Sequence, residues 1–171
     1  MNTAEVIKMG NPLLLKRAEE IKDYNDPELE SIINLMQNTM IEKTGVGIAA
    51  PQIGISKRII IFGFESNSRY PNEKSVPLTV LINPVIKILD KTEEDGWEGC
   101  LSVPGLRGLV PRYIKIEYTG YSFTDKKEIT RVAEGFHARV VQHEIDHLDG
   151  VLYPRRIKDL TKFGYEDSLV F

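Results

Sequence analysis

Two histidines and a glutamate stand close together in the stretch QHEIDHL, at positions 142–148. His143 and His147 are four residues apart, so on a helix they project from one face and can reach a single cation. Glu144 lies beside them, where its carboxylate can approach a water on that cation without ligating the metal, as a general base must. The pattern predicts a metal-dependent hydrolase, although short strings of this form also occur by chance on surface helices.

A third metal ligand is needed, because catalytic sites of this kind usually have three protein ligands and one water. Glu166 lies nineteen residues after His147, roughly where a thermolysin-like protease has its ligand, but no helical periodicity surrounds it. Asp149 stands at the expected helix end, where a solvated charge is the ordinary interpretation. Cys100 offers a thiolate in EGCLSVPG, a segment typical of a strand end that turns into a loop. Such a loop can deliver a sulfur to a helix.

The residues by themselves leave three interpretations open. Glu166 as third ligand predicts a zincin-type metallopeptidase, in which Cys100→Ala keeps the metal. Cys100 as third ligand predicts either a hydrolase or a non-catalytic metal-binding protein that stores or senses the ion. A lone cysteine is also often a small buried hydrophobic residue with no role at all. The metal content of Cys100→Ala and Glu166→Ala distinguishes a site ligated by Cys100 from a zincin site ligated by Glu166.

Three segments together resemble the signature motifs of the peptide deformylase family. They are GVGIAAPQ at 45–52, EGCLS at 98–102 and QHEIDHL at 142–148, in the same order and at similar separations. The likeness continues through QIGISKRIIIF, LINP and RGLVPR and covers most of the chain from Met9 to Pro154. It implies a monomeric bacterial metallohydrolase that removes the formyl group from the N-terminal formylmethionine of newly made proteins, releasing formate.

The resemblance also implies a role for each matched residue. Cys100, His143 and His147 would ligate the metal, Glu144 would act as general base and then acid, and Gln52 with the backbone N–H of Leu101 would form the oxyanion hole. Metal-bound water would be the nucleophile, because a cation lowers the pKa of its water from about 15.7 toward 7. The family implies one divalent ion, ferrous iron first, and zinc, nickel or cobalt suit the same ligands.

Several further residues are expected to contact the substrate. Gly45 and Gly47 let a backbone approach closely, and Phe136 and Val140 share a helix face with His143. The expected set is Gly45, Gly47, Ile48, Gly99, Arg107, Phe136 and Val140. Core packing is the competing interpretation for Phe136 and Val140, and a helix end with a tight turn for the two glycines. Arg139 either covers the mouth of the pocket or extends to water.

The elements that must position these residues are readable from apolar spacing. Asp26 and Pro27 begin a helix whose apolar residues recur to Met40, and a second helix begins near Glu134 and ends before Gly150. Strands are predicted at 57–64, at 76–89 with a break at Asn83–Pro84, at 112–123, and at 126–132 after a TDKK turn. The prediction is one α+β domain over 1–171, with mostly antiparallel short strands packed around a central metal-binding helix.

The amino-acid composition limits the classes of partner that this chain is expected to bind. The chain has 42% hydrophobic residues, 27% charged residues and a net charge of −3, so it has no basic footprint for nucleic acid. It has no apolar run of the roughly 20 residues that a membrane span needs, and its single cysteine suits a reducing compartment. We therefore expect a cytoplasmic protein that acts on formyl-Met nascent polypeptides.

Two features depart from the commonest family pattern. The polar stretch ESNSRYPNEKSVP at 65–77 predicts a longer surface loop. Only fourteen residues follow LYPRRI, where many family members continue into a long basic helix. Any contact with the ribosome is therefore expected to be transient. Glu98 and Asp146 are expected to orient the ligand imidazoles as supporting carboxylates.

Overall fold

The computed structural model describes residues 2–68 and 70–170 and has an α+β fold, as expected. The helices and strands in chain order are α1 (Glu28–Glu42), β1 (Gly47–Ala49), β2 (Ile59–Phe64), β3 (Val76–Cys100), β4 (Val103–Ser122), β5 (Lys127–Glu134), α2 (Gly135–Leu148) and β6 (Phe163–Tyr165). The strands pair antiparallel in the order β1-β2-β3-β4-β5, and β6 pairs with β4. The predicted antiparallel sheet is confirmed.

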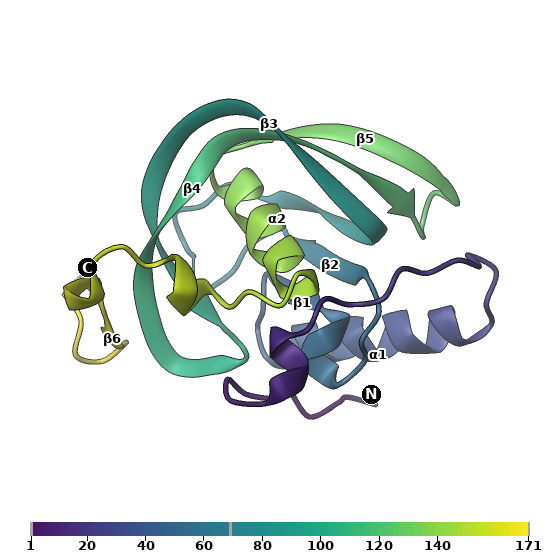
Figure 1. Ribbon diagram of the computed structural model, residues 1–171, viewed down its shortest axis with the longest axis horizontal. Coiled ribbons are helices and arrows are strands. Elements are labelled where there is room, and N and C mark those ends of the chain that lie inside the picture. Colours follow the sequence, from purple (N-terminus) through teal and green to yellow (C-terminus); the bar gives the residue numbers. More distant parts are fainter. Residues whose placement is uncertain (1, 69, 171) are drawn as a thin grey trace.

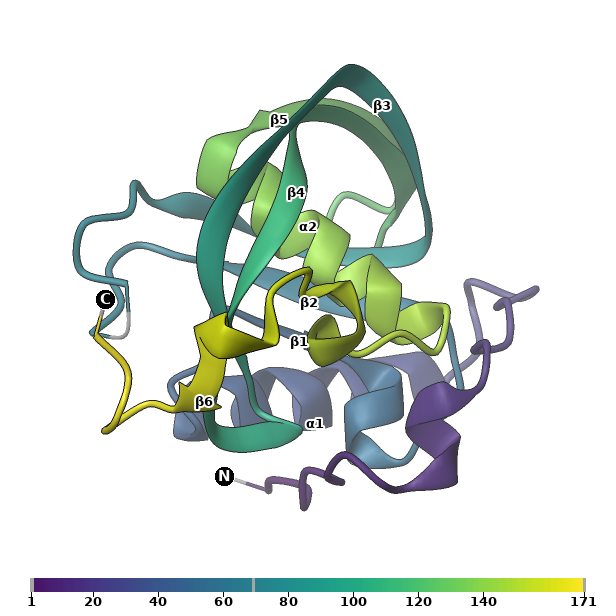
Figure 2. The same ribbon diagram turned by 60° about the vertical axis from the view of Figure 1, so that its left-hand side comes forward.

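The sheet curves around α2, which lies at the centre of the molecule (Figures 1 and 2). Strands β3, β4 and β5 arch over one side of this helix, and β1, β2 and α1 lie on the other. The helix residues Val141 and Leu148 are fully buried, in one cluster with Phe62 of β2 and Tyr118 of β4. Each such side chain contributes about 1.5–3 kcal/mol when withdrawn from water. His143 and His147 therefore stand on a helix that the curved sheet encloses.

Helix α1 covers the opposite face of β1, β2 and β3. Asp26 Oδ1 accepts a hydrogen bond of 2.9 Å from the backbone N–H of Glu28 at its start. Its apolar stripe, which includes Leu29 and Met36, packs on Ile59 and Ile61 of β2. The helix and its packing on the sheet follow the prediction from apolar spacing.

The expectation of short strands is wrong for β3 and β4, which have 25 and 20 residues. The break predicted at Asn83–Pro84 is a bulge and not an end, because β3 continues while its register on β4 shifts between Ile82 and Val85. Asn83 has a φ of +50°, and its side chain hydrogen-bonds both backbone groups of Ile21, at 3.0 and 2.8 Å. Local turn residues thus bend the strand without ending it.

Three predicted connections are present. The β4–β5 turn contains Lys126 with a φ of +55°, and the stretch between β2 and β3 is a loop in its described residues, with position 69 outside them. Gly150 ends α2 with a φ of +73°, where Val151 N–H donates to the Asp146 carbonyl at 2.9 Å. Only Leu101 and Ser102 separate β3 from β4, so Cys100 stands at the tip of a tight hairpin.

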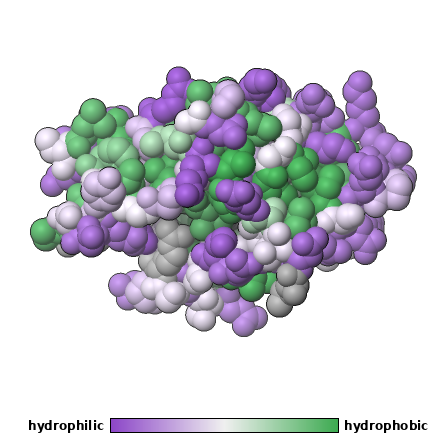
Figure 3. Space-filling model, turned by 90° about the horizontal axis from the view of Figure 1, so that it is seen from below, coloured by the Kyte–Doolittle hydropathy of each residue, from purple (hydrophilic) through white to green (hydrophobic). Residues whose placement is uncertain are grey.

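The face shown in Figure 3 interleaves hydrophobic and hydrophilic residues. No helix in the described part of the chain is both long enough and apolar enough to cross a bilayer.

Candidate metal centre

The tip of the β3–β4 hairpin meets the histidine pair of α2. The ligand atoms of Cys100, His143 and His147 lie within 4.8 Å of one another. Cys100 and His147 are buried, and the His143 side chain is 11% exposed. Cys100 Sγ is 3.3 Å from His147 Nε2, a separation that suits two ligands each roughly 2.0–2.3 Å from one ion. A thiolate and two imidazoles fit a divalent transition metal.

The other two candidate ligands lie elsewhere. Glu166 Oε1 accepts a hydrogen bond of 2.8 Å from Arg107 Nε, and Asp149 Oδ1 accepts one of 2.8 Å from Arg58 Nη1. Neither belongs to the donor cluster found among the described residues. The zincin interpretation needs Glu166 at the cation and is therefore wrong for this chain.

Glu98 fixes one of the two imidazoles. Its Oε2 is 2.8 Å from His143 Nδ1, which leaves His143 Nε2 for the cation. Arg112 binds the same carboxylate with two hydrogen bonds, of 2.8 and 3.0 Å. Burial alone would raise the pKa of Glu98, but the charge of Arg112 and the hydrogen bonds from His143 and Arg112 hold it well below its usual range. Glu98 is therefore an anion at any working pH.

Asp146 does not orient an imidazole, which corrects the expectation for it. It accepts hydrogen bonds from Arg112 Nη1 at 2.5 Å and from Arg156 Nη2 at 2.6 Å. Asp146 thus holds Arg112 in place, and Arg112 in turn holds Glu98. Arg112 was not foreseen from the sequence, because a single arginine within a strand has no spacing that marks it as buried.

Glu144 is buried beside the cluster. Burial raises the pKa of Glu144 to about 7, and its Oε2 is buried with no hydrogen-bond partner among the described residues. A Cβ added at Gly47 would lie 2.3 Å from Glu144 Oε1. Gly47 is therefore a glycine because the carboxylate occupies the space of a side chain.

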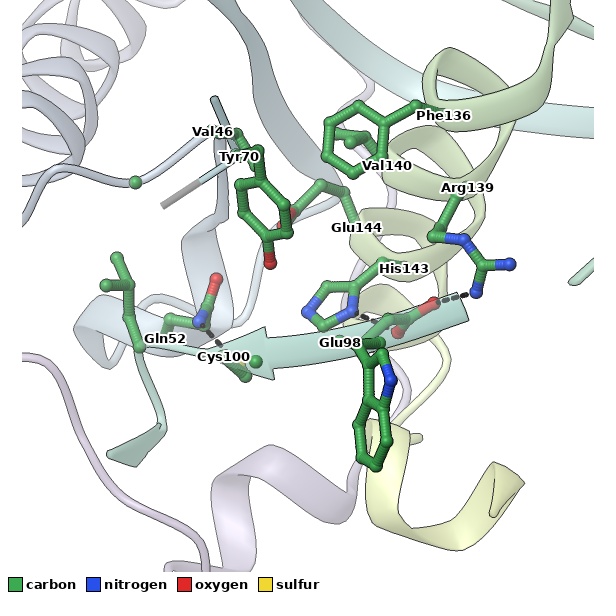
Figure 4. A pocket seen from close by; sticks show the side chains of 15 residues that line it. Val46, Gln52, Tyr70, Glu98, Cys100, Phe136, Arg139, Val140, His143 and Glu144 are labelled. Carbon is green, nitrogen blue, oxygen red and sulfur yellow. Dashed lines mark hydrogen bonds and ion pairs between the residues drawn. The ribbon is translucent and has the colours of Figure 1, made fainter. Parts of the chain in front are cut away.

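Gln52 is fixed at both ends of its amide. The residue is 1% exposed, and its Oε1 accepts a hydrogen bond of 2.8 Å from Ala49 N–H. This bond aims Nε2 at Cys100 Sγ, 3.5 Å away (Figure 4), and Nε2 also donates to Ser102 Oγ, 3.2 Å away. A buried amide with a donor facing the metal thiolate is in place to bond a developing negative charge.

A cavity opens directly onto this cluster. It is lined by Gly45, Val46, Gly47, Gln52, Tyr70, Trp97, Glu98, Gly99, Cys100, Leu101, Phe136, Arg139, Val140, His143 and Glu144. Figure 4 shows Val46, Tyr70, Phe136 and Val140 gathered above the polar residues. The apolar side chains therefore form one wall of the cavity, and the candidate catalytic groups form its floor.

Most of the residues expected at the substrate line this cavity, but two do not. Ile48 is fully buried and packs in the core beneath α1, so only its backbone can face a substrate. Arg107 lies with Cζ 5.2 Å from the centre of the Tyr70 ring, next to its ion pair with Glu166. Tyr70, Val46 and Trp97 were missed, and the one available signal for Tyr70 was an aromatic residue within a polar loop.

Residues 3–163 match the family model described as polypeptide deformylase, a range that contains every cavity residue. The chain belongs to this family. Among curated relatives, peptide deformylase 1 of Bordetella pertussis is 59% identical over 164 residues, covering 96% of this chain and 93% of that protein. Peptide deformylase 1 of Nitrosomonas europaea is 55% identical over the same length.

Solved deformylases share the fold. The crystal structure of class I type b peptide deformylase from Acinetobacter baumannii with bound Met-Ala-Ser has a TM-score of 0.86 and 39% identity, covering 91% of this chain and 98% of that one. The deformylase of Thermotoga maritima has a TM-score of 0.81 and 34% identity. The resemblance read from three motifs is confirmed: this chain is a metal-binding hydrolase that removes the N-formyl group from nascent peptides.

Proposed function

We propose that the deformylase reaction uses Cys100, His143 and His147 to hold one divalent cation, Glu144 to move the proton, and Gln52 with the Leu101 backbone N–H to bind the oxyanion. The convergence of the three ligand atoms within 4.8 Å carries this proposal. A cation held there supplies a Lewis acid and lowers the pKa of water toward neutrality. Ferrous iron is proposed first, and zinc, nickel or cobalt fit the same donors.

Glu144 takes a proton from the attacking water and delivers it to the nitrogen that leaves as the new amino terminus. Two features of the residue support this role. Its unpartnered Oε2 needs a hydrogen-bonding group from water or substrate, and burial raises its pKa to about 7. A carboxyl with a pKa near the working pH can both accept and return a proton.

The Gln52 side-chain N–H and the Leu101 backbone N–H donate hydrogen bonds to the formyl oxygen as negative charge develops on it. Because Ala49 N–H already holds Gln52 Oε1 at 2.8 Å, the amide does not have to reorient during the reaction. Leu101 follows Cys100 at the hairpin tip and lines the same cavity. Preorganised donors of this kind are typically worth about 3 kcal/mol each.

The substrate is placed by the walls of the cavity. We propose that the side chain of the first residue lies against Phe136 and Val140, while the backbone follows Gly45, Gly47 and the backbone of Ile48, with Gly99 beside the metal ligand. The Acinetobacter enzyme has a crystal structure with bound Met-Ala-Ser, which supports a peptide as the ligand of this cavity. Arg107 would meet the peptide further from the metal, next to Tyr70.

We propose that residues 1–171 act as one catalytic domain, as a monomer in the cytoplasm, on formyl-Met polypeptides and with at most transient ribosome contact. The net charge of −3 supports a protein without nucleic-acid specificity. The lone cysteine supports a reducing compartment.

Formate release from formyl-Met-Ala-Ser tests the catalytic roles. The protein is purified anaerobically with iron, and Glu144→Gln is compared with Glu134→Gln, the same change at an exposed site ten residues earlier. We expect Glu144→Gln to keep its metal and to lose roughly 100- to 10,000-fold in kcat, while Glu134→Gln stays active. A metal-loaded Glu144→Gln protein within tenfold of the unsubstituted chain would show that the proton moves through another group.

A further inference from the structure

Arg139 places a cation in the wall of the substrate cavity. It lies on α2 one turn before His143, and it lines the cavity together with Phe136 and Val140 (Figure 4). Its side chain is only 11% exposed. Instead of extending to water, as one expectation had it, the side chain folds inward so that Nη1 lies 3.0 Å from Glu98 Oε1. A buried guanidinium is costly unless it is paired, so its presence beside apolar residues calls for a reason.

Gly96 of β3 makes room for this guanidinium. A Cβ at Gly96 would lie 2.6 Å from Cζ, 2.7 Å from Nη2 and 2.8 Å from Nε of Arg139. Because the three distances are nearly equal, the plane of the guanidinium lies flat over the Gly96 backbone. Arg139 borders both the inner cavity and an outer cleft, whereas Gly96 borders only the outer one. Phe136 borders both spaces as well, so Arg139 and Phe136 together separate them.

The hydrogen bonds of Arg139 hold it in place without using all its donors. Nη1 donates to the Val110 carbonyl at 2.7 Å, to Glu98 and, more weakly, to the Gly96 carbonyl at 3.5 Å, and Nη2 donates to the Glu94 carbonyl at 2.6 Å. A guanidinium has five N–H groups, so the Nε–H and the second Nη2–H have no acceptor among the described residues. Nε has no partner and is not among the buried unpartnered atoms of those residues, so an added group can reach it.

Charges of both signs surround Arg139. Arg112, Arg139 and Arg156 share Glu98 and Asp146, while Glu94 and Asp95 border the outer cleft and Glu144 borders the inner cavity. An acceptor atom that reached the Nε–H would form a charge-assisted hydrogen bond, and such bonds are the stronger kind. A hydrocarbon end in the same place would leave that donor unpaired.

We propose that Arg139 is a specificity-determining residue that lets the pocket accept a first side chain ending in a hydrogen-bond acceptor, above all the sulfoxide of oxidised formylmethionine. This inference rests on the proposed position of that side chain against Phe136 and Val140. Methionine sulfoxide keeps the length of methionine and adds one acceptor oxygen, whereas norleucine has the same length and no acceptor. The apolar wall binds the methylene groups of both, so Arg139 is the feature that distinguishes their ends. Formyl hydrolysis itself is unchanged.

The experiment compares formyl-Met(O)-Ala-Ser with formyl-Nle-Ala-Ser on the iron-loaded protein. The quantity measured is the ratio of their kcat/KM values, with formyl-Met-Ala-Ser as reference, for the unsubstituted chain, Arg139→Met and Arg139→Lys. Both substrates meet the same preparation, so the folded and metal-loaded fraction cancels from the ratio. A merely structural role for Arg139 would change all three substrates alike and leave the ratio unmoved.

We expect the unsubstituted chain to use the sulfoxide at least as well as norleucine. Arg139→Met should lower the ratio by roughly tenfold or more, mainly through KM, and Arg139→Lys, which keeps a cation, should recover part of it. An equal ratio in Arg139→Met overturns the inference. If that variant does not fold, a sulfoxide rate below one-tenth of the norleucine rate in the unsubstituted chain overturns it alone. Failure to cleave formyl-Met-Ala-Ser would instead remove the proposed catalytic roles, and this inference with them.

Discussion

At the scale of single residues, the site depends on a few side chains that satisfy several neighbours at once. Glu98 is 3% exposed and bonds a metal-binding imidazole and two guanidiniums, those of Arg112 and Arg139. Gly47 has no side chain, and the Glu144 carboxylate fills the space that a side chain would occupy. A substitution at Glu98 is expected to weaken metal binding, and a substitution at Gly47 is expected to slow catalysis.

Glu98→Gln removes the charge and keeps the shape. The buried Arg112 and Arg139 then lose their ionic partner, and we expect the free energy of unfolding to fall by about 3–5 kcal/mol. His143 loses the acceptor that orients it, and metal affinity should fall about 10- to 100-fold. Urea unfolding and competition with a chelator measure the two effects. Unchanged affinity would show that the Glu98 contact does not orient His143.

Gly47→Ala should damage catalysis without removing the metal. A Cβ there would lie 2.3 Å from Glu144 Oε1, so the carboxylate must move, and a displacement of about 1 Å can cost roughly 100-fold in rate. The same substitution at Gly164 is the control, because this residue does not line the cavity and its Cβ would meet no atom closer than 3.4 Å. Elemental analysis with formate release measures both variants. Equal activity in the two would mean that Glu144 is not held by this contact.

At the scale of elements, the site is a meeting of one helix with one hairpin. Helix α2 presents both imidazoles, and the two-residue turn after β3 brings the thiolate to them. The end of the helix is fixed by Gly150, which lies against the segment containing Leu15. His147 is three residues before this glycine, so the end of α2 and the ligand geometry are coupled.

Gly150→Ala should destabilise the fold more than Gly135→Ala at the other end of the same helix. Both glycines have positive φ, +73° and +56°, so both substitutions cost about 1–3 kcal/mol in backbone strain. Only at Gly150 would the Cβ also meet backbone, 2.5 Å from the Leu15 carbonyl oxygen, since nothing lies within 4 Å of it at Gly135. Thermal unfolding of the two metal-loaded variants compares them. Equal losses of melting temperature would mean that the Leu15 backbone moves away from the added Cβ at no cost in stability.

At the scale of the whole molecule, much of the fold was readable from the sequence. The apolar spacing of α1 and α2 indicated the two helices, because that signal is local and periodic. The donor cluster joins residues far apart in the chain, and it was indicated by the resemblance that the three motifs carry. The length of β3 was not readable, since Asn83 and Pro84 look like a strand end and only the contact with Ile21 shows a bulge. The inward orientation of the Arg139 side chain was also not readable from the sequence, because it depends on Gly96, 43 residues away in the chain.

The stability of the metal-free protein should depend on pH through Glu144. Burial raises its pKa in the folded state to about 7, above the ordinary 4.5, so the folded state favours the protonated form. The stability from that proton is full below about 4.5, is lost as pH rises through about 7, and leaves a constant deficit of a few kcal/mol above it. Glu144→Gln cannot lose this proton. Its melting temperature without metal should therefore exceed that of the unsubstituted chain more at pH 8 than at pH 5, and a difference independent of pH would argue against a raised pKa.

The central claim is that a hairpin thiolate and two helical imidazoles hold one cation. The most direct test is the metal content per chain of anaerobically purified Cys100→Ala beside Glu166→Gln, measured by elemental analysis after gel filtration. We expect one divalent ion per chain in Glu166→Gln and close to none in Cys100→Ala. A full equivalent of metal in Cys100→Ala, with loss in Glu166→Gln, would contradict it.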